Sequence, residues 1–281
     1  MKPAAPLADF ARIVQAALAE DLGERGDITT EAVVPAGTGM KAVIRSREDG
    51  CIAGVDSIPI VLARFSEPAS AQIVAADGTE VRAGDIVATL SGSAQTLLSA
   101  ERVILNLVGR LSGIATATAA VVRAVAGTGA AIKDTRKTTP GLRMLEKYAV
   151  AVGGGVNHRF GLFDAVLIKD NHIAAAGSVA GAVSRVRARW GEAFPIQVEV
   201  DTLVQLEEAL AIGVGAVLLD NMAPDVLRRA VAVARGRCHL EASGGITLAN
   251  VRAVAETGVD SISLGWLTHS ARSLDLGLDI G

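Results

Sequence analysis

The sequence predicts an α/β protein in which an N-terminal α+β domain with an antiparallel sheet precedes a C-terminal incomplete α/β barrel. Three observations lead to this prediction. Short strand candidates in the first half lie too close together for parallel pairing. Strand and helix candidates alternate regularly in the second half, as they do around a parallel sheet. Polar residues also recur near the ends of successive strands, at Glu199, Asp220, Glu241 and Ser263, and their intervals of 21, 21 and 22 residues fit one strand plus one helix.

The first half begins with a helix over Ala11–Leu22, whose apolar residues fall on one face and which Gly23 can end as a C-cap. Four short strands are expected after it: Lys41–Arg45, Cys51–Val55, Ala71–Ala75 and Ile86–Leu90. Turn signals at residues 77–78 and 83–85 separate the later strands. A parallel crossover needs a dozen or more residues, so these strands are expected to pair antiparallel. A long helix is expected from about Gln95 to Gly113.

The second half contains six short apolar runs that read as strands. They are Ala130–Lys133, Ala165–Lys169, Ile196–Val200, Ala216–Leu219, His239–Ala242 and Ser261–Leu264. Residues typical of helix starts follow three of these runs, at Thr202, Pro224 and Thr247. The alternation predicts a parallel sheet, which is either doubly wound or closed as a barrel.

The polar strand ends favour the barrel. In a barrel the C-terminal ends of the strands converge on one mouth, where active sites are built, whereas an open sheet would spread them along a line. Given the residues available, we expect fewer than eight strands. The barrel is expected over residues 113–269, and the N-terminal domain over residues 1–112, joined by the tail 270–281.

The composition excludes several classes of protein. Half of the 281 residues are hydrophobic, which excludes an intrinsically disordered chain. With 27 Lys and Arg against 30 Asp and Glu, the net charge of −3 disfavours nucleic-acid binding, which needs a basic face. Cys51 and Cys238 lie far apart and are expected to be buried thiols. Because no uncharged run reaches about 20 residues and no apolar segment opens the chain, we expect a soluble cytoplasmic protein with no membrane contact.

Positive charge is concentrated between residues 131 and 172, where seven Lys and Arg accompany four Asp and Glu. The simpler interpretation is a solvated surface run. Against it, Lys169 ends an apolar strand, and Arg136 and Lys137 directly follow another. Cations at barrel strand ends point into the mouth, and Arg binds carboxylate or phosphate through a bidentate fork. The cluster therefore predicts a site for an anion.

Two loops of small residues follow the last two strands, Ser243-Gly244-Gly245 and Leu264-Gly265-Trp266. Backbone N–H groups in such loops can approach a phosphate closely, and barrels frequently hold phosphate after their last two strands. One Gly-Gly pair is more often an ordinary turn. Two such loops on consecutive strands favour phosphate binding.

Glu199 and Asp220 have two interpretations. They could serve as first-turn acids of the following helices, a role that Asp201 could also fill. Alternatively, two carboxylates in a cationic mouth could bind Mg²⁺ or ribose hydroxyls, or stabilise a developing positive charge. The residues alone therefore predict a barrel enzyme that binds a phosphorylated sugar and a carboxylated partner.

Long motifs in the chain resemble the quinolinate phosphoribosyltransferase family. These motifs are Glu101–Arg102, Arg110–Thr116, Asp134–Arg143, Glu146–Val150, Gly153–Arg159, Leu167–His172, Leu219–Met222, Glu241–Gly245 and Leu267–Ser270. The resemblance runs nearly end to end and implies the incomplete barrel of type II phosphoribosyltransferases. It implies an enzyme that joins quinolinate to phosphoribosyl pyrophosphate with Mg²⁺, giving nicotinate mononucleotide, pyrophosphate and CO₂ in NAD biosynthesis.

The resemblance also implies roles for individual residues. Its catalytic set is Lys137, Lys169, Glu199 and Asp220, of which Glu199 and Asp220 would hold Mg²⁺. Its quinolinate set is Arg136, His158, Arg159 and Lys169, with Arg102 from a neighbouring subunit. Its remaining substrate-binding residues are Thr135, Lys137, Asn171, His172, Ser243, Gly244, Gly245, Leu264, Gly265 and Trp266. Because Arg102 would cross to another subunit, the resemblance implies a homodimer with a shared active site.

Three alternatives remain open. The chain could be a paralogue like the molybdenum-transport-associated ModD proteins, a Schiff-base lyase that uses Lys169, or a metabolite-binding barrel without catalysis. Trp266 departs from the family pattern, in which a smaller residue is expected. Its indole could narrow the phosphate loop or pack against the N-terminal sheet.

Overall fold

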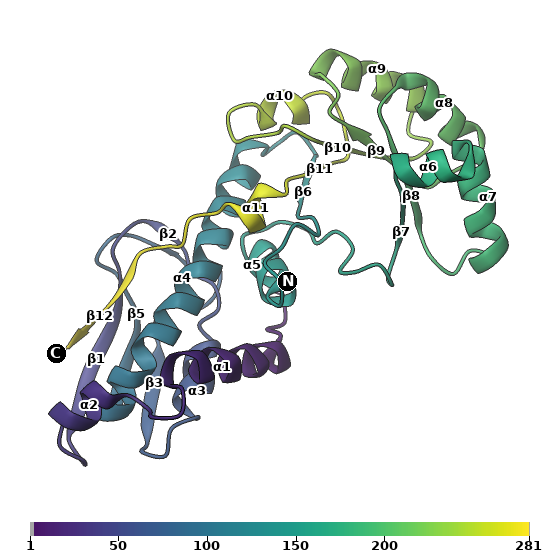
Figure 1. Ribbon diagram of the computed structural model, residues 1–281. Coiled ribbons are helices and arrows are strands. Elements are labelled where there is room, and N and C mark those ends of the chain that lie inside the picture. The colour runs from purple at the N-terminus through teal and green to yellow at the C-terminus, as the bar shows by residue number, and fades with distance from the viewer. Residues whose placement is uncertain (1–2, 281) are drawn as a thin grey trace. The chain divides into compact units, whose positions relative to one another are not determined.

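The computed structural model describes residues 3–280, so the outermost residues of the predicted N-terminal domain and tail, 1–2 and 281, lie outside it (Figure 1). The chain forms two compact units. Unit 1 comprises Met1–Ala119, Thr138–Gly154 and Trp266–Gly281, and unit 2 comprises Ala120–Lys137 and Gly155–Gly265.

Unit 1 contains a four-stranded antiparallel sheet in the order β12-β1-β5-β3. Its strands are β1 (Gly39–Ser46), β3 (Ala69–Ile73), β5 (Ile86–Ser93) and β12 (Leu276–Ile280). Short strands β2 (Gly50–Cys51) and β4 (Glu80–Val81) form a separate antiparallel pair. The expected antiparallel pairing is confirmed, and the last strand of the chain lies beside β1.

The expected strand over Cys51–Val55 is wrong beyond Cys51. The Asp77 carboxylate accepts hydrogen bonds from the backbone N–H groups of Gly54 at 2.9 Å and Val55 at 3.0 Å. Gly54 has φ +88°, a left-handed conformation that suits glycine. These two features turn the chain out of the sheet and into helix α3 (Ser57–Leu62).

The helices of unit 1 lie before, between and after these strands in the sequence. They are α1 (Leu7–Leu22), α2 (Ile28–Val33), α3, α4 (Ala94–Ala124, whose last residues, 120–124, belong to unit 2), α5 (Arg143–Val152) and α11 (Trp266–His269). Helix α1 ends at the predicted Gly23 cap. Helix α4 continues past its expected end at Gly113. This glycine serves a close approach of the backbone and not a helix end, since an added Cβ would lie 1.9 Å from the carbonyl oxygen of Arg272.

Helix α4 is also the one helix within residues 3–280 whose length and hydropathy would allow it to cross a membrane. Of its apolar 18-residue window, 61% is buried in the protein. Side chains such as Leu97, Ile104 and Val108 are buried in the hydrophobic core of unit 1. This is the pattern of a core helix.

Unit 2 is a six-stranded, wholly parallel sheet in the order β6-β11-β10-β9-β8-β7. Its strands are β6 (Ala131–Lys133), β7 (Val166–Ile168), β8 (Ile196–Val200), β9 (Ala216–Asp220), β10 (His239–Ser243) and β11 (Ser261–Ser263). Strands β6 and β7 stand at the two ends of this order. The prediction of an incomplete barrel with fewer than eight strands is confirmed.

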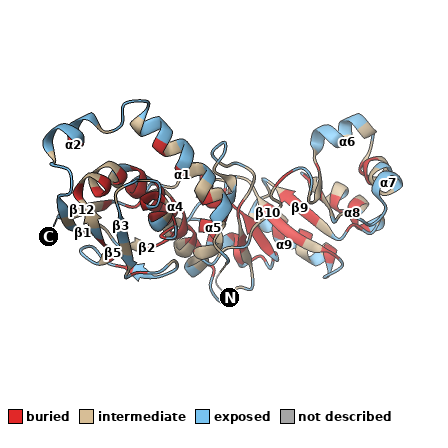
Figure 2. Cartoon of the chain, turned by 90° about the horizontal axis from the view of Figure 1, so that it is seen from below, coloured by how far each residue is buried: buried red, intermediate tan, exposed pale blue. Residues whose placement is uncertain are grey.

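Helices alternate with the strands of unit 2. They are α6 (Asp170–Ala176), α7 (Val179–Trp190), α8 (Leu203–Ala211), α9 (Pro224–Ala234) and α10 (Val251–Ala255). In Figure 2, strands β9 and β10 are mostly buried, whereas α6 is mostly exposed. Two predicted starts are confirmed: Thr202 caps α8, and Pro224 opens α9. The third is wrong, because Thr247 donates its N–H to Asn250 Oδ1 in a turn and α10 begins only at Val251.

Candidate active site

The carboxyl ends of the barrel strands carry polar side chains. The register pairs Asp220 with Ser243, Ser243 with Ser263, and Ser263 with Lys133. Glu199 is the penultimate residue of β8, and Lys169 directly follows β7. The expected mouth therefore exists, with cations and carboxylates on neighbouring strands.

Glu241 is not at this mouth, contrary to the sequence prediction. It is the third residue of β10, where it pairs with Leu218 and Ser261, and it is fully buried. Ser243 takes the end position instead. Ser243 follows Asp220 by 23 residues, two more than the predicted interval of 21, so equal spacing pointed to a residue two positions before the strand end.

Lys169 and Glu199 form an ion pair at the mouth, with Nζ 2.6 Å from Oε2. The lysine side chain is 44% exposed and the carboxylate 14%. The backbone N–H of Lys169 donates to Nδ1 of His172, which fixes the first turn of α6. Asn171 and His172 are both exposed on that turn. An incoming anion can therefore reach Lys169 and compete with Glu199 for it.

Asp220 ends β9 beside other carboxylates and cations. Burial and the neighbouring Asp201 raise its pKa above the ordinary value, although Lys169, Asn221 and Lys137 act in the opposite direction. The side-chain amide of Asn221 donates to Asp220 Oδ2 at 2.7 Å. A partly desolvated carboxylate next to a second one would be stabilised by a cation.

Two guanidinium groups, on Arg136 and Arg159, lie close enough to repel. Burial and the charge of Arg136 lower the pKa of Arg159, and Asp164 only partly offsets them. Nη1 of Arg159 donates to the carbonyl oxygen of Ala165 at 3.0 Å. Next to Arg136, the exposed Lys137 donates its backbone N–H to Thr135 Oγ1 at 3.0 Å. A bound anion would relieve the repulsion between the two arginines.

Asp134 is fully buried and was not among the predicted site residues. One carboxylate oxygen accepts from the Asn157 amide at 2.6 Å and the other from the His158 backbone N–H at 2.8 Å. An acid directly after a strand, inside a basic cluster, is the signal that could have identified it. The carboxylate joins the β6 loop to the segment that carries Arg159.

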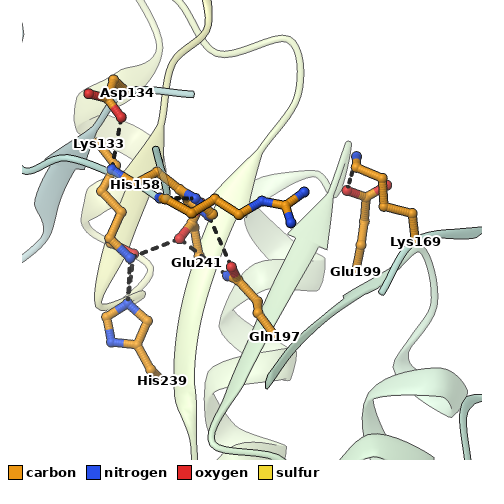
Figure 3. Close-up of polar contacts among 10 residues, drawn as sticks. Lys133, Asp134, His158, Lys169, Gln197, Glu199, His239 and Glu241 are labelled. Carbon is orange, nitrogen blue, oxygen red and sulfur yellow. Dashed lines mark hydrogen bonds and ion pairs between the residues drawn. The ribbon is translucent and has the colours of Figure 1, made fainter. Parts of the chain in front are cut away.

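Below the mouth, polar side chains meet inside the barrel (Figure 3). Lys133 Nζ lies 2.9 Å from Glu241 Oε2 and 3.4 Å from His239 Nε2. Gln197 donates to the same carboxylate oxygen at 3.2 Å, and its amide oxygen lies 3.0 Å from His158 Nε2. Burial would raise the pKa of Glu241, but the nearby His158 ring and the Lys133 ammonium lower it below its ordinary value.

The loop after β10 requires its first glycine. Gly244 has φ +91°, and an added Cβ would lie 2.1 Å from Asn221 Oδ1. Gly245 has φ +62° and open space around it. The loop after β11 begins with Leu264, whose N–H donates to the Lys133 carbonyl at 2.9 Å. Asn221 thus lies directly against Gly244, and a residue with a Cβ would not fit at this position.

Two predicted site residues belong to unit 1. Arg102 is exposed on α4, and Trp266 is half-buried at the start of α11. Unit 1 also has a hollow of about 710 Å³, lined in part by Lys41 and Glu67, which contains none of the predicted site residues. The remaining predicted site residues, from Thr135 to Gly265, all lie in unit 2.

No group of three or more His, Cys, Asp or Glu side chains within residues 3–280 is arranged to hold a metal ion. Asp220 and Asp201 nevertheless interact, as the raised pKa of Asp220 indicates. Glu199 is engaged by Lys169. Mg²⁺ is commonly held by one or two carboxylates together with substrate phosphates. The carboxylates of Asp220 and Asp201 therefore fit a metal that arrives with a phosphorylated substrate.

Comparison with known proteins identifies the family. A model for the quinolinate phosphoribosyl transferase N-terminal domain matches residues 27–112, and one for the C-terminal domain matches residues 114–279. A nicotinate-nucleotide pyrophosphorylase [carboxylating] from Mycobacterium leprae is 50% identical over 274 residues, covering 95% of each chain. A probable nicotinate-nucleotide pyrophosphorylase [carboxylating] from Bacillus subtilis is 46% identical over 261 residues, covering 93% of this chain and 90% of the relative.

A solved structure has the same fold. The crystal structure of nicotinate-nucleotide pyrophosphorylase from Ehrlichia chaffeensis superposes with a TM-score of 0.94, at 41% identity, over 100% of both chains. The two domain models together span most of this chain, and the relatives match it over nearly their full length. The chain belongs to the quinolinate phosphoribosyltransferase family.

Proposed function

We propose that this protein transfers the phosphoribosyl group of phosphoribosyl pyrophosphate to quinolinate, with loss of CO₂, to form nicotinate mononucleotide. The observation that carries the proposal is the repelling pair Arg136 and Arg159, together with the accessible Lys169 at the carboxyl end of β7. Quinolinate has two carboxylates, and each suits a guanidinium fork or an ammonium group. The names of the relatives agree with this substrate and with decarboxylation.

Phosphoribosyl pyrophosphate carries two further anionic groups. Lys137 and Lys169 would bind its pyrophosphate. Both interact with Asp220 at the mouth, and Lys137 is exposed. The loops Ser243–Gly245 and Leu264–Trp266 would hold the 5′-phosphate through backbone N–H groups. Thr135, Asn171 and His172 border these groups in the sequence and complete the proposed substrate-binding set.

The chemistry follows from these placements. The bond between ribose C1 and the pyrophosphate oxygen breaks, and its electron pair leaves with pyrophosphate. Glu199 and Asp220 would stabilise the positive charge that develops at C1. The ring nitrogen of quinolinate then donates its lone pair to C1. The resulting pyridinium accepts the electron pair left when the 2-carboxylate departs as CO₂, and a proton from water restores the ring C–H bond.

Mg²⁺ is part of the proposal as a companion of phosphoribosyl pyrophosphate. Asp220, with Asp201 nearby, would hold it more readily than Glu199, whose carboxylate is paired with Lys169. When bound, the ion supplies positive charge for the leaving pyrophosphate.

The Schiff-base alternative is disfavoured by the surroundings of Lys169. A lysine nucleophile needs a neutral amine, which an apolar pocket or a neighbouring cation provides. Lys169 instead contacts a carboxylate at 2.6 Å and is 44% exposed, an environment that keeps the ammonium charged.

The first experiment measures release of CO₂ and pyrophosphate from quinolinate and phosphoribosyl pyrophosphate with Mg²⁺, with nicotinate as the parallel substrate. We expect equimolar release of both products from quinolinate and no turnover of nicotinate. Folded protein that releases neither product would contradict the proposal.

Arg159→Ala tests the quinolinate site. It removes a charge-assisted contact of about 1.5–3 kcal/mol, so the KM for quinolinate should rise about 10- to 150-fold. Arg25→Ala, which changes an exposed arginine of unit 1, is the matched control and should leave the KM unchanged. Unchanged kinetics in Arg159→Ala would contradict the assignment.

A homodimer with a shared site is also part of the proposal. Arg102 lies exposed on α4, away from the charged mouth in the sequence, and would bind quinolinate in the site of a second copy. Mixing Arg102→Ala and Lys169→Ala chains should restore part of the activity, because one site of each mixed dimer would then have both residues. No recovery in purified mixed dimers would count against sharing.

A further inference from the structure

The interior of the barrel is polar where barrels are normally filled by branched apolar residues. Lys133, Gln197, His239 and Glu241 lie on inward-facing positions of three strands and contact one another (Figure 3). Glu241 is fully buried. Burying a charge is costly unless it is paired and hydrogen-bonded, so this layer calls for an explanation beyond packing.

The orientation of Gln197 follows from its neighbours. The Glu241 carboxylate accepts from Lys133, and as a carboxylate it can only accept. The Gln197 group 3.2 Å from Glu241 Oε2 must therefore be the amide nitrogen. The amide oxygen then faces Nε2 of His158 at 3.0 Å. Because an amide oxygen can only accept, Nε2 must carry a proton.

The other ring nitrogen of His158 is also engaged. The backbone N–H of Arg159 donates to Nδ1 at 2.7 Å. A proton on Nδ1 would set two donors against each other at that distance. One proton, on Nε2, satisfies both contacts, and the proximity of Glu241 Oε1 at 3.6 Å favours the same nitrogen.

This arrangement also secures Arg159. Its backbone N–H is held by the His158 ring, and its guanidinium is held by the Ala165 carbonyl. The His158 backbone N–H is in turn held by buried Asp134 at 2.8 Å. The chain of contacts thus runs from the barrel interior to a guanidinium of the mouth.

We infer that Glu241 and Gln197 are positioning residues that hold the His158 ring as the neutral Nε2–H tautomer, so that Nδ1 accepts from the Arg159 backbone N–H and sets the Arg159 backbone. The inference rests on the proposed function, in which Arg159 binds quinolinate.

The first test is the protonation of His158 in ¹⁵N-histidine NMR spectra of the whole protein. The chain has four histidines, and a His158→Asn variant identifies the relevant signals by their loss. We expect one proton on Nε2, protected from solvent exchange, in the free protein. We expect the same state with saturating quinolinate alone, where no turnover occurs. An imidazolium, or a proton that moves to Nδ1 when quinolinate binds, would overturn the inference.

The second test is Gln197→Met, which keeps the volume but removes both amide contacts. We expect loss of the His158 proton protection and a shift of the Arg159 backbone amide signal. Loss of the hydrogen bond to His158, worth about 1 kcal/mol, predicts a KM for quinolinate about fivefold higher. We expect kcat to stay within about twofold and the KM for phosphoribosyl pyrophosphate to be unchanged. The matched control, Gln15→Met on the exposed face of α1, should change none of these.

The outcomes separate the inference from the proposed function. A wild-type protein that does not use quinolinate refutes the function, while the proton and amide signals of the free protein still test the positioning chain. A normal quinolinate KM in Gln197→Met, or signals for His158 and Arg159 that do not respond to it, refutes the positioning role.

Discussion

The barrel contains two lysine–glutamate pairs that differ mainly in burial. Lys133 and Glu241 are 2.9 Å apart, with side chains 19% and 0% exposed, whereas Lys169 and Glu199 are 2.6 Å apart and 44% and 14% exposed. Attraction between charges strengthens as water is excluded, and so does the cost of leaving one charge alone. The deep pair is therefore suited to holding structure, and the mouth pair to exchanging partners.

Their neighbours support this contrast. The deep carboxylate also accepts from Gln197, which leads to His158. The mouth pair lies near Asp220, whose pKa Lys169 lowers, and next to exposed residues of α6. Similar side chains thus serve stability where they are buried and ligand binding where they are exposed.

Glu241→Gln should have the largest effect on stability. Removing one partner of a buried pair leaves Lys133 without a countercharge, which costs about 3–5 kcal/mol in free energy of unfolding. The measurement is urea unfolding followed by tryptophan fluorescence. Trp190 reports on unit 2 and Trp266 on unit 1, so a Trp266→Phe background isolates the barrel.

The deep pair can also be removed as a whole. Lys133→Met combined with Glu241→Leu leaves no unpaired charge and should be more stable than either single variant. A Glu241→Gln protein within about 1 kcal/mol of wild type would show that the two pairs do not differ as argued.

Lys169→Ala should have the next largest effect, and it should appear in activity. Loss of a charge-assisted contact to substrate should lower kcat/KM by about 1.5–3 kcal/mol, or about 10- to 150-fold. The free energy of unfolding should change by less than about 1 kcal/mol, because a half-exposed ion pair contributes little. Lys41→Ala, at an exposed site in unit 1, is the control for charge removal. A large loss of stability with normal kinetics would reverse the assignment of the two pairs.

Much of this barrel could be predicted from the sequence, because alternating strands and helices indicate a parallel sheet and the polar strand ends favour the barrel over a doubly wound sheet. The strands β8, β9 and β10 lie within one residue of their expected bounds. The end of β10 could not be predicted from equal spacing, since a longer helix and loop before this strand placed Ser243, and not Glu241, at its end.

Gln197 was missed because an amide carries no charge and belongs to no motif. Its signal was present in the alternation of β8, where Gln197 and Glu199 are two residues apart and so share a face. His158 presents the opposite case. The resemblance implied a substrate contact, which stays a prediction, but the direction of its ring depends in part on Gln197, which lies 39 residues away in the chain.

Asp220→Asn should have the smallest effect on stability, and its sign is informative. Because the pKa of Asp220 is raised by burial and Asp201, the folded protein binds a proton at this site more tightly than the unfolded chain does. Its contribution to stability is full below the unfolded pKa and is lost as the pH rises through the folded pKa. At neutral pH the ionised carboxylate therefore lowers stability, and Asp220→Asn should raise the free energy of unfolding by less than about 1 kcal/mol.

The same variant should lose activity, mainly in kcat, because the proposed charge stabilisation at C1 is removed. Urea unfolding at several pH values should show the gain in stability at neutral pH and its disappearance at acidic pH, where Asp220 is protonated in wild type. A variant that is less stable than wild type at neutral pH, or that changes only KM, would mean that Asp220 belongs with the structural pair below it. A more stable but slower protein would place Asp220 with Lys169, among the residues of the mouth that serve the substrate.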